Sequence, residues 1–332
     1  MPSLRPIRVG MIGTAAVAPI ALIAPAQKVS GVDVVAIADR EPGRARAFAS
    51  RHGIPHVDRT FEELLENPGV DAVYIAAAAS HHEHLVTAAV RAGKHVLCEK
   101  PFTSNAGAAR EVLRVAAASP GVVVMEAYHP AYHPLQQLIR NVLKSGQLGQ
   151  ITAARAVHAV PVISRAADPW KRELGGGGLL DAGYYPVRQL RELFGEPQSI
   201  LDARAWSKGE VDRRFESRML FAKNIQGSIV SSIWSRTLLA SRLEVTGDNG
   251  ALTVSWPYHP QMGARLTVRA GGVRRVRPIK RRSSYIYQLE AFRDAILTGA
   301  RPLTSAADSV AQIETIDALY FRAGLAARPS RA

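Results

Sequence analysis

Apolar and polar positions follow one rhythm up to about residue 126 and another beyond it. In the first part, short and nearly continuous apolar runs alternate with stretches that repeat apolar residues at helical spacing. The runs span residues 7–12, 32–38, 70–77, 96–98 and 122–125, and the helical stretches end at residue 26 or span 41–52, 61–66, 82–92 and 105–117. Strands covered on both faces by crossover helices have such sequences. The first part therefore predicts a doubly wound parallel sheet.

Beyond residue 126, short segments alternate apolar and polar residues with a period of two. They span 151–160, 199–206, 217–222, 228–234, 242–246, 252–256 and 265–269, and candidate helices span 135–143, 180–193, 285–297 and 306–323. Alternation joined by tight turns is typical of antiparallel strands. We therefore predict an α/β chain with two domains. Residues 1–126 form the parallel sheet, and residues 127–332 form an α+β domain with a large, mostly antiparallel open sheet.

Composition narrows the class of protein. The 332 residues are 47% hydrophobic and 21% charged, as in soluble globular proteins. A single cysteine, Cys98, excludes an internal disulfide, no apolar run is long enough to span a membrane, and residues 1–8 lack the layout of a signal peptide. From these features we expect a cytoplasmic protein.

The net charge of +14 raises the question of an anionic partner. Its densest part is the basic run at residues 274–282. Such a run binds nucleic acid or an anionic ligand, or forms a solvated edge strand that charge protects from aggregation. Because no aromatic residues are interleaved with it to stack on bases, the edge strand is favoured over nucleic acid. The sequence leaves the role of the run open.

The stretch 94–102 contains the clearest candidate for chemistry. An apolar strand ends there in Glu99, Lys100 and Pro101, and Pro101 removes a backbone donor, so the strand must stop. In open α/β sheets, ligands bind outside the carboxyl ends of the strands. Lys100 is therefore a candidate catalytic residue, and the alternative is a strand end with two solvated charges.

A second candidate site follows the first strand. The turn from Gly13 to Ala18 keeps the first glycine of a dinucleotide-binding fingerprint and has Ala15 and Ala18 at the later two positions. Asp39, which closes the second strand, is placed to bind both ribose hydroxyls. Its carboxylate repels a 2′-phosphate, which favours NAD, whereas Arg40 either covers the adenine or pairs with that phosphate. We predict NAD or NADP as cofactor, with NAD favoured.

Three stretches together resemble one known family. They are Gly13-Thr14-Ala15, residues 92–101 and residues 176–185, in this order. The chain resembles the glucose–fructose oxidoreductase / inositol dehydrogenase (Gfo/Idh/MocA) family, and within it the dimeric dihydrodiol dehydrogenase and xylose dehydrogenase branch. The resemblance implies a Rossmann-type N-terminal domain and a C-terminal open sheet that mediates assembly into a homodimer or homotetramer.

The resemblance also places chemistry on three residues. It makes Lys100 the catalytic lysine, Asp181 the carboxylate that fixes the substrate, and Tyr185 the acid/base. If one helix runs from Leu180, then Asp181 and Tyr185 share a face at i and i+4. A neighbouring ammonium, which Lys100 could supply, lowers the pKa of a tyrosine. The alternatives are a helix-start carboxylate and a core-edge aromatic residue.

The predicted cofactor-binding residues come from the first turn, the end of the second strand and the loops after the third and fourth. They are Gly13, Thr14, Ala15, Ala16, Asp39, Arg40, Ala77, His82, Glu99 and Lys100. His82 matches a recurrent family histidine near the nicotinamide. We predict no metal site in the cluster His81, His82 and His84, because adjacent histidines on a turn point in different directions.

We therefore predict an NAD(P)-dependent oxidoreductase. It transfers a hydride between nicotinamide and a secondary alcohol or carbonyl of a sugar, polyol or cyclic diol. The alternative is a cofactor-binding regulator of the same fold without turnover. Ala131 and Ala79 stand where the family commonly has Arg and Asn, so the sequence leaves the substrate and the physiological direction open.

Overall fold

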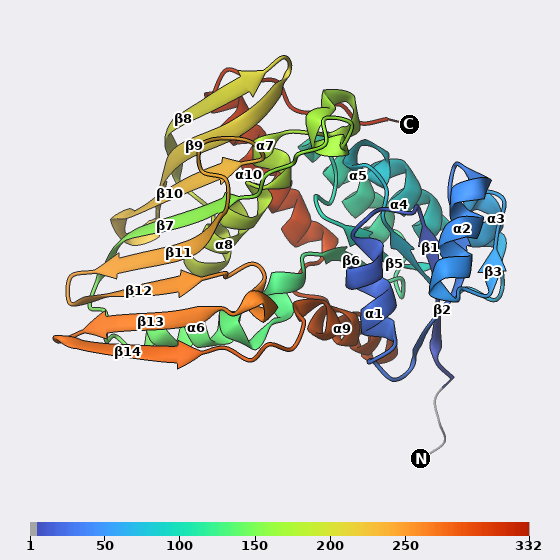
Figure 1. The fold of residues 1–332 in the computed structure, drawn as a ribbon, viewed down its shortest axis with the longest axis horizontal. Helices are drawn as coiled ribbons and strands as arrows, with labels where there is room; N and C mark the ends of the chain where they lie inside the picture. Colours follow the sequence, from blue (N-terminus) through green and yellow to red (C-terminus); the bar gives the residue numbers. More distant parts are fainter. Residues whose placement is uncertain (1–4, 332) are drawn as a thin grey trace.

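Two sheets side by side form the framework of the molecule (Figure 1). The computed structural model describes residues 5–331; the first four residues of the N-terminal segment considered above, and the last residue, lie outside the described part. Within the described residues, no helix combines the length and the apolar character that crossing a membrane requires.

The first sheet has six parallel strands in the order β3-β2-β1-β4-β5-β6, which confirms the prediction of a doubly wound parallel sheet. Its strands are β1 (Ile7–Ile12), β2 (Val32–Ala38), β3 (His56–Val57), β4 (Ala72–Ile75), β5 (His95–Glu99) and β6 (Val124–Ala127). The sequence pattern missed β3 because two residues carry no periodicity. The strand order reverses between β1 and β4, which is where such sheets bind dinucleotides.

Helices cover both faces of this sheet. On one face pack α3 (Phe61–Glu66), α4 (His82–Arg91) and α5 (Ala106–Ala117). On the other pack the π-helical turn η1 (Pro19–Ile23), which continues into α1 (Ala24–Ala26), and also α2 (Pro42–His52) and α9 (Ser284–Thr298). The expected single helix ending at residue 26 is thus a π turn followed by one short α turn. Although α9 comes late in the chain, it buries Leu289 and Phe292 against the first sheet.

The second sheet has eight strands in the order β14-β13-β12-β11-β7-β10-β9-β8. They are β7 (Ile151–Ala159), β8 (Ser199–Lys208), β9 (Val211–Phe221), β10 (Ile225–Ser232), β11 (Ala240–Gly247), β12 (Gly250–Ser255), β13 (Arg265–Ala270) and β14 (Val273–Pro278). Only β7 and β10 pair in parallel, so the prediction of a mostly antiparallel sheet is confirmed. One face carries α6 (Pro134–Lys144), α8 (Tyr184–Phe194) and α10 (Ala306–Arg322) (Figure 1). The basic run forms the fully exposed edge strand β14 and the loop after it.

A buried polar network joins the two sheets. Glu126 at the end of β6 accepts hydrogen bonds from Arg188 of α8 at 2.9 Å and from Ser309 of α10 at 2.8 Å, and the hydroxyl of Tyr184 also donates to it. Glu126, Arg188 and Ser309 are at most 1% exposed. Because β6 runs to Ala127, the first sheet extends slightly past residue 126, and the domain division there stays a prediction.

Candidate active site

Lys100 and Asp181 form an ion pair where the two domains meet. Lys100 follows β5, and its Nζ donates to Asp181 Oδ1 at 2.9 Å and to the Asp181 backbone oxygen at 3.4 Å. Asp181 is the last residue of the short helix α7 (Gly178–Asp181). The side chain of Lys100 is 16% exposed and that of Asp181 is 32% exposed, so both remain open to a small molecule.

Tyr185 completes this group, but not on the helix predicted from the sequence. The expected helix over 180–193 is two helices, α7 and α8, separated by Ala182 and Gly183, so Asp181 and Tyr185 do not share one helical face. The break allows a close approach at Gly183, where a Cβ would lie 2.6 Å from the backbone oxygen of Leu179. Lys100 Nζ nevertheless lies 5.0 Å from the centroid of the Tyr185 ring.

Charge at the site favours the ammonium form of Lys100. Burial lowers the pKa of Lys100, but the charge and hydrogen bond of Asp181, together with the charge of Glu99, outweigh it and raise that pKa above its ordinary value. Burial raises the pKa of Glu99 to about 7, against the hydrogen bond from Tyr74 at 2.7 Å and the charge of Lys100. Lys100 is therefore a fixed cation at the carboxyl end of β5.

The phenol of Tyr185 is neutral in this structure. Burial, followed by the carboxylates of Glu99, Asp181 and Glu126, raises the pKa of Tyr185 well above 10. The expectation of a lowered pKa is therefore wrong, because the desolvation of Tyr185 and three nearby carboxylates were not visible from the sequence. A neutral phenol is able to donate a proton.

The imidazole of His82 links two loops beside the site. The residue is 1% exposed, with Nδ1 2.9 Å from the backbone oxygen of Pro101 and Nε2 3.0 Å from that of Ala77. Both ring nitrogens are thus engaged by backbone, and burial lowers the pKa of His82. His82 ties the loop after β4 to the loop after β5. Among residues 5–331, no three His, Cys, Asp or Glu side chains converge as metal ligands.

The first turn fits the pyrophosphate of a dinucleotide. Gly13 has φ +89°, and a Cβ there would lie 2.4 Å from the backbone oxygen of Ala76, so only glycine fits. In the described part of the chain, the backbone N–H groups of residues 14–17 have no hydrogen-bond acceptor and are free for an anion. At the end of β2, Asp39 accepts from the Thr14 hydroxyl at 2.7 Å and from the Glu41 N–H at 2.9 Å, and Arg40 is exposed.

A cavity of about 140 Å³ lies between the Lys100–Asp181 pair and the loops that face it. Its walls come from the loop after β4, from the end of β5 and from the segment before α7. They include Ala77, His82, Lys100, Gly175, Gly176 and Asp181. Four predicted site residues therefore line one cavity, whereas Gly13, Thr14, Ala15, Ala16, Asp39 and Arg40 lie along the neighbouring ends of β1 and β2.

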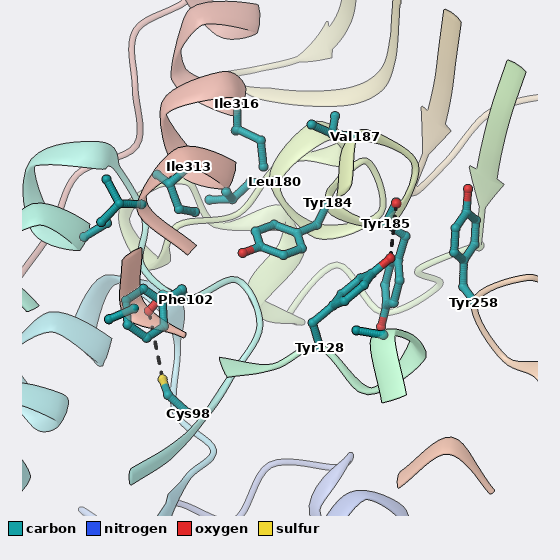
Figure 2. Close-up of a cluster of buried hydrophobic side chains, with 14 of the residues drawn as sticks. Cys98, Phe102, Tyr128, Leu180, Tyr184, Tyr185, Val187, Tyr258, Ile313 and Ile316 are labelled. Carbon is teal, nitrogen blue, oxygen red and sulfur yellow. Dashed lines mark hydrogen bonds between the residues drawn. The ribbon is translucent and has the colours of Figure 1, made fainter. Parts of the chain in front are cut away.

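Sequence reasoning missed a cluster of rings around Tyr185. His158 of β7 lies 4.9 Å from the Tyr185 ring centroid, Tyr258 lies 5.4 Å away and His259 lies 5.7 Å away. Figure 2 shows Tyr128 and Tyr258 beside Tyr185. Burial and the charge of Lys100 lower the pKa of His259 to about 4, so its imidazole is neutral. The two-residue alternation of β7 puts His158 on the same face as buried Ala156. This alternation could have indicated from the sequence that His158 faces the interior.

Comparison with known proteins agrees with this site. Residues 7–128 match the model of an oxidoreductase family with an NAD-binding Rossmann fold, and residues 136–253 match the GFO/IDH/MocA C-terminal domain. An uncharacterized oxidoreductase, ORF334, of Rhizobium meliloti is 30% identical over 89% of this chain and 90% of its own. The trans-1,2-dihydrobenzene-1,2-diol dehydrogenase of Mus musculus is 35% identical over 68% of each chain.

Solved structures lead to the same class. The 3-ketoreductase KijD10 from Actinomadura kijaniata, in complex with NADP and TDP-benzene, superposes with a TM-score of 0.89 at 25% identity, covering 99% of this chain and 100% of its own. The fold and the site thus define a nicotinamide-dependent oxidoreductase. The chain belongs to the Gfo/Idh/MocA family, which confirms the resemblance inferred from its motifs.

Proposed function

We propose that the enzyme transfers a hydride between nicotinamide and a secondary alcohol or carbonyl carbon of a sugar, polyol or cyclic diol. The observation that carries the proposal is the Lys100–Asp181 pair beside Tyr185, at the carboxyl end of β5 and one strand away from the strand-order reversal. Relatives named for such substrates support it, among them the dihydrobenzenediol dehydrogenase of Mus musculus and the D-xylose 1-dehydrogenase (NADP(+)) 2 of Haloferax volcanii, which is 29% identical over 94% of this chain.

Different residues stabilise charge, transfer a proton and bind the cofactor. When bound, the nicotinamide supplies or accepts the hydride. Tyr185 exchanges one proton with the substrate oxygen, the Lys100 ammonium stabilises negative charge on that oxygen, and Asp181 holds Lys100 in place and contacts the substrate. Gly13, Thr14, Ala15 and Ala16 bind the pyrophosphate, Asp39 and Arg40 the adenosine half, and Ala77, His82 and Glu99 line the nicotinamide end.

We propose NAD as the preferred cofactor. The Asp39 carboxylate stands at the end of β2, where it accepts hydrogen bonds from a free 2′-hydroxyl and repels a 2′-phosphate. Arg40, which follows it, is exposed and placed to cover the adenine. Dissociation constants measured for NADH and NADPH test this choice, and tighter binding of NADPH contradicts it.

The proposed setting is a cytoplasmic homodimer or homotetramer that forms through the second sheet. One face of that sheet carries helices α6, α8 and α10, which leaves its other face to meet a second subunit. The exposed strand β14 supports a solvated edge rather than a nucleic-acid site, because its six residues include no aromatic side chain.

A substrate panel tests the function directly. Sugars, polyols and cyclic diols, with their carbonyl counterparts, are assayed with each cofactor by the absorbance of reduced nicotinamide. Turnover of at least one alcohol–carbonyl pair is expected. Tight cofactor binding without turnover across the panel would contradict the proposal and favour a regulator.

A further inference from the structure

A buried arginine far along the chain holds the segment that leads to Asp181. Arg328 lies beyond α10 and is 2% exposed. Its Nε donates to the backbone oxygen of Gly176 at 2.7 Å, and its Nη2 pairs with the carboxylate of Asp212. The guanidinium also lies 4.3 Å from the centroid of the Tyr320 ring. A buried arginine is kept in place by such fixed acceptors.

Asp212 connects Arg328 to the start of α7. It is fully buried in β9, and its Oδ2 accepts from the Leu179 N–H at 2.7 Å. The Tyr320 hydroxyl donates to Asp212 Oδ1 at 3.1 Å and accepts from the Leu180 N–H at 3.2 Å. Two N–H groups of the first turn of α7, which have no partner within the helix, are thus fixed by the Arg328 network.

The packing leaves this network little room to shift. Gly177 has φ +153°, and a Cβ there would lie 2.5 Å from both Asp212 Oδ1 and the Tyr320 hydroxyl. It would also lie 2.8 Å from Arg328 Nη2. The glycine run therefore lets the backbone pass directly over Asp212 and Arg328, one turn before Asp181.

Residues 325–331 also reach the first domain. The Asn105 side chain donates to the backbone oxygen of Arg328 at 2.9 Å, and the Arg331 N–H donates to the backbone oxygen of Ser80 at 2.8 Å. Ser330 donates to Glu83 at 2.6 Å. The segment that carries Arg328 is thus fixed to the domain that carries Lys100.

We propose that Arg328 is a positioning residue, which sets Asp181 on Lys100 by fixing the start of α7 through Asp212 and Gly176. The positioning itself does not depend on which reaction is catalysed. Its catalytic consequence rests on the proposed function, because there the Asp181-held ammonium stabilises charge on the substrate oxygen.

The reactivity of the Lys100 amine reports on the Asp181–Lys100 ion pair and can be measured without a substrate. The groups that face Lys100 from the surrounding elements are Asp181, Glu99, Tyr185, Tyr285, His129, His158 and His259. Only the free amine reacts with acetic anhydride, so each unit by which its pKa falls makes labelling about tenfold faster at pH 8. Labelling of Lys100 is measured by mass spectrometry relative to exposed Lys144 in the same molecule.

The variants form a cycle. Asp181→Asn removes the carboxylate and should speed relative labelling of Lys100 about tenfold or more. Arg328→Met should speed it in the same direction, and the double variant should match Asp181→Asn alone. Arg322→Met, which removes an exposed arginine at the end of α10, should leave labelling unchanged. If Arg328 only shielded Lys100 from the reagent, Arg328→Met would expose Lys100, and labelling in the double variant would exceed that in Asp181→Asn alone.

Two outcomes overturn the proposal: unchanged Lys100 labelling in folded Arg328→Met, or additive effects in the double variant. Should the lone Asp212 carboxylate unfold Arg328→Met, the pair Arg328→Met with Asp212→Asn removes both charges and keeps an acceptor for Leu179, and the same criteria apply. A further outcome is that labelling follows the expected cycle while Asp181→Asn and Arg328→Met turn over the substrate at the parent rate. In that case Arg328 does position Asp181, and the role given to Lys100 in the proposed function fails.

Discussion

Tyr185 is a buried phenol in contact with a cation and with three neutral histidines. Burial lowers the pKa of His129 and His158 well below 6.5, and of His259 to about 4, with Lys100 adding to the effect. The aromatic and imidazole rings therefore surround Tyr185 without adding charge. The site therefore places one phenol, Tyr185, beside one cation, Lys100, among neutral rings.

Tyr185→Phe should retain cofactor binding and lose most hydride transfer, by about 100- to 10,000-fold. The ring keeps its packing against Tyr128 and Tyr258, and only the hydroxyl is removed. Because the pKa of Tyr185 lies well above 10, only a small fraction is phenolate at neutral pH, and this fraction grows as the pH rises. The rate of alcohol oxidation should therefore still be rising at about pH 9. Stopped-flow absorbance across pH should show this rise in the parent and not in the variant. A variant with the parent rate and pH profile would remove Tyr185 from the chemistry.

Gly13→Ala should unfold more easily and bind cofactor poorly. Its Cβ would lie 2.4 Å from the Ala76 oxygen at a φ of +89°, so the free energy of unfolding should fall by about 2–4 kcal/mol. Gly53→Ala is the matched control, because Gly53 has φ +70° with nothing within 4 Å of its Cβ position and should lose only about 1 kcal/mol. Equal losses in a denaturant titration would show that the close approach at Gly13 is unimportant.

At the scale of elements, β5 shows why charged residues can end a buried strand. Its last residue, Glu99, is 7% exposed and accepts from the Tyr74 hydroxyl and from the Lys100 N–H at 3.2 Å. These bonds only partly offset the cost of burial, so the pKa of Glu99 rises to about 7. The strand end therefore takes up a proton near neutral pH.

That proton makes stability depend on pH. Because the pKa of Glu99 is about 7 in the folded protein and about 4.3 when unfolded, the unfolded state loses this proton first as pH rises. The Glu99 contribution is present below pH 4 and is lost on passing 7. Relative to the parent, Glu99→Gln should gain about 2.5 kcal/mol of unfolding free energy between pH 5 and pH 8, whereas exposed Glu62→Gln should gain none. A flat difference for Glu99→Gln would contradict the raised pKa.

Sequence periodicity predicted the long elements well and the breaks poorly. The strand over Ile7–Ile12 and the helix over Phe61–Glu66 have the predicted bounds, because one clear period runs through each. The helix expected over 180–193 divides at Ala182 and Gly183, where the backbone of Leu179, four residues earlier, comes too close for a Cβ at Gly183. The spacing of apolar residues does not show such a contact. Likewise, Lys100, Asp181 and Tyr185 were identified through motifs, whereas His158, His259 and Arg328 come together only in the folded chain.

At the scale of the whole molecule, two segments of the second half return to the first half. Helix α9 packs on the first sheet, and residues 325–331 contact Ser80, Glu83 and Asn105. Together with the buried Glu126–Arg188 pair, they make each half part of the other's core. A sequence division at residue 126 cannot show this, since the contacts join residues more than 60 positions apart. The site lies next to both segments, because Tyr285 of α9 faces Lys100 and Arg328 holds Gly176 in the cavity wall.

The second sheet should join subunits. One of its faces is covered by the chain's own helices, so we expect sedimentation velocity at micromolar concentration to give a dimer or a tetramer. A single monomeric species under these conditions would contradict assembly through this sheet.

The central claim is that Lys100, held by Asp181 beside Tyr185, acts in the hydride transfer. Its most direct test is the turnover of Lys100→Met at saturating substrate and cofactor, with exposed Lys144→Met as the control. We predict that Lys100→Met stays folded and binds NADH but loses about 100- to 10,000-fold in kcat, while Lys144→Met keeps the parent rate. A folded, NADH-binding Lys100→Met with the parent kcat would show that Lys100 is only the end of a strand.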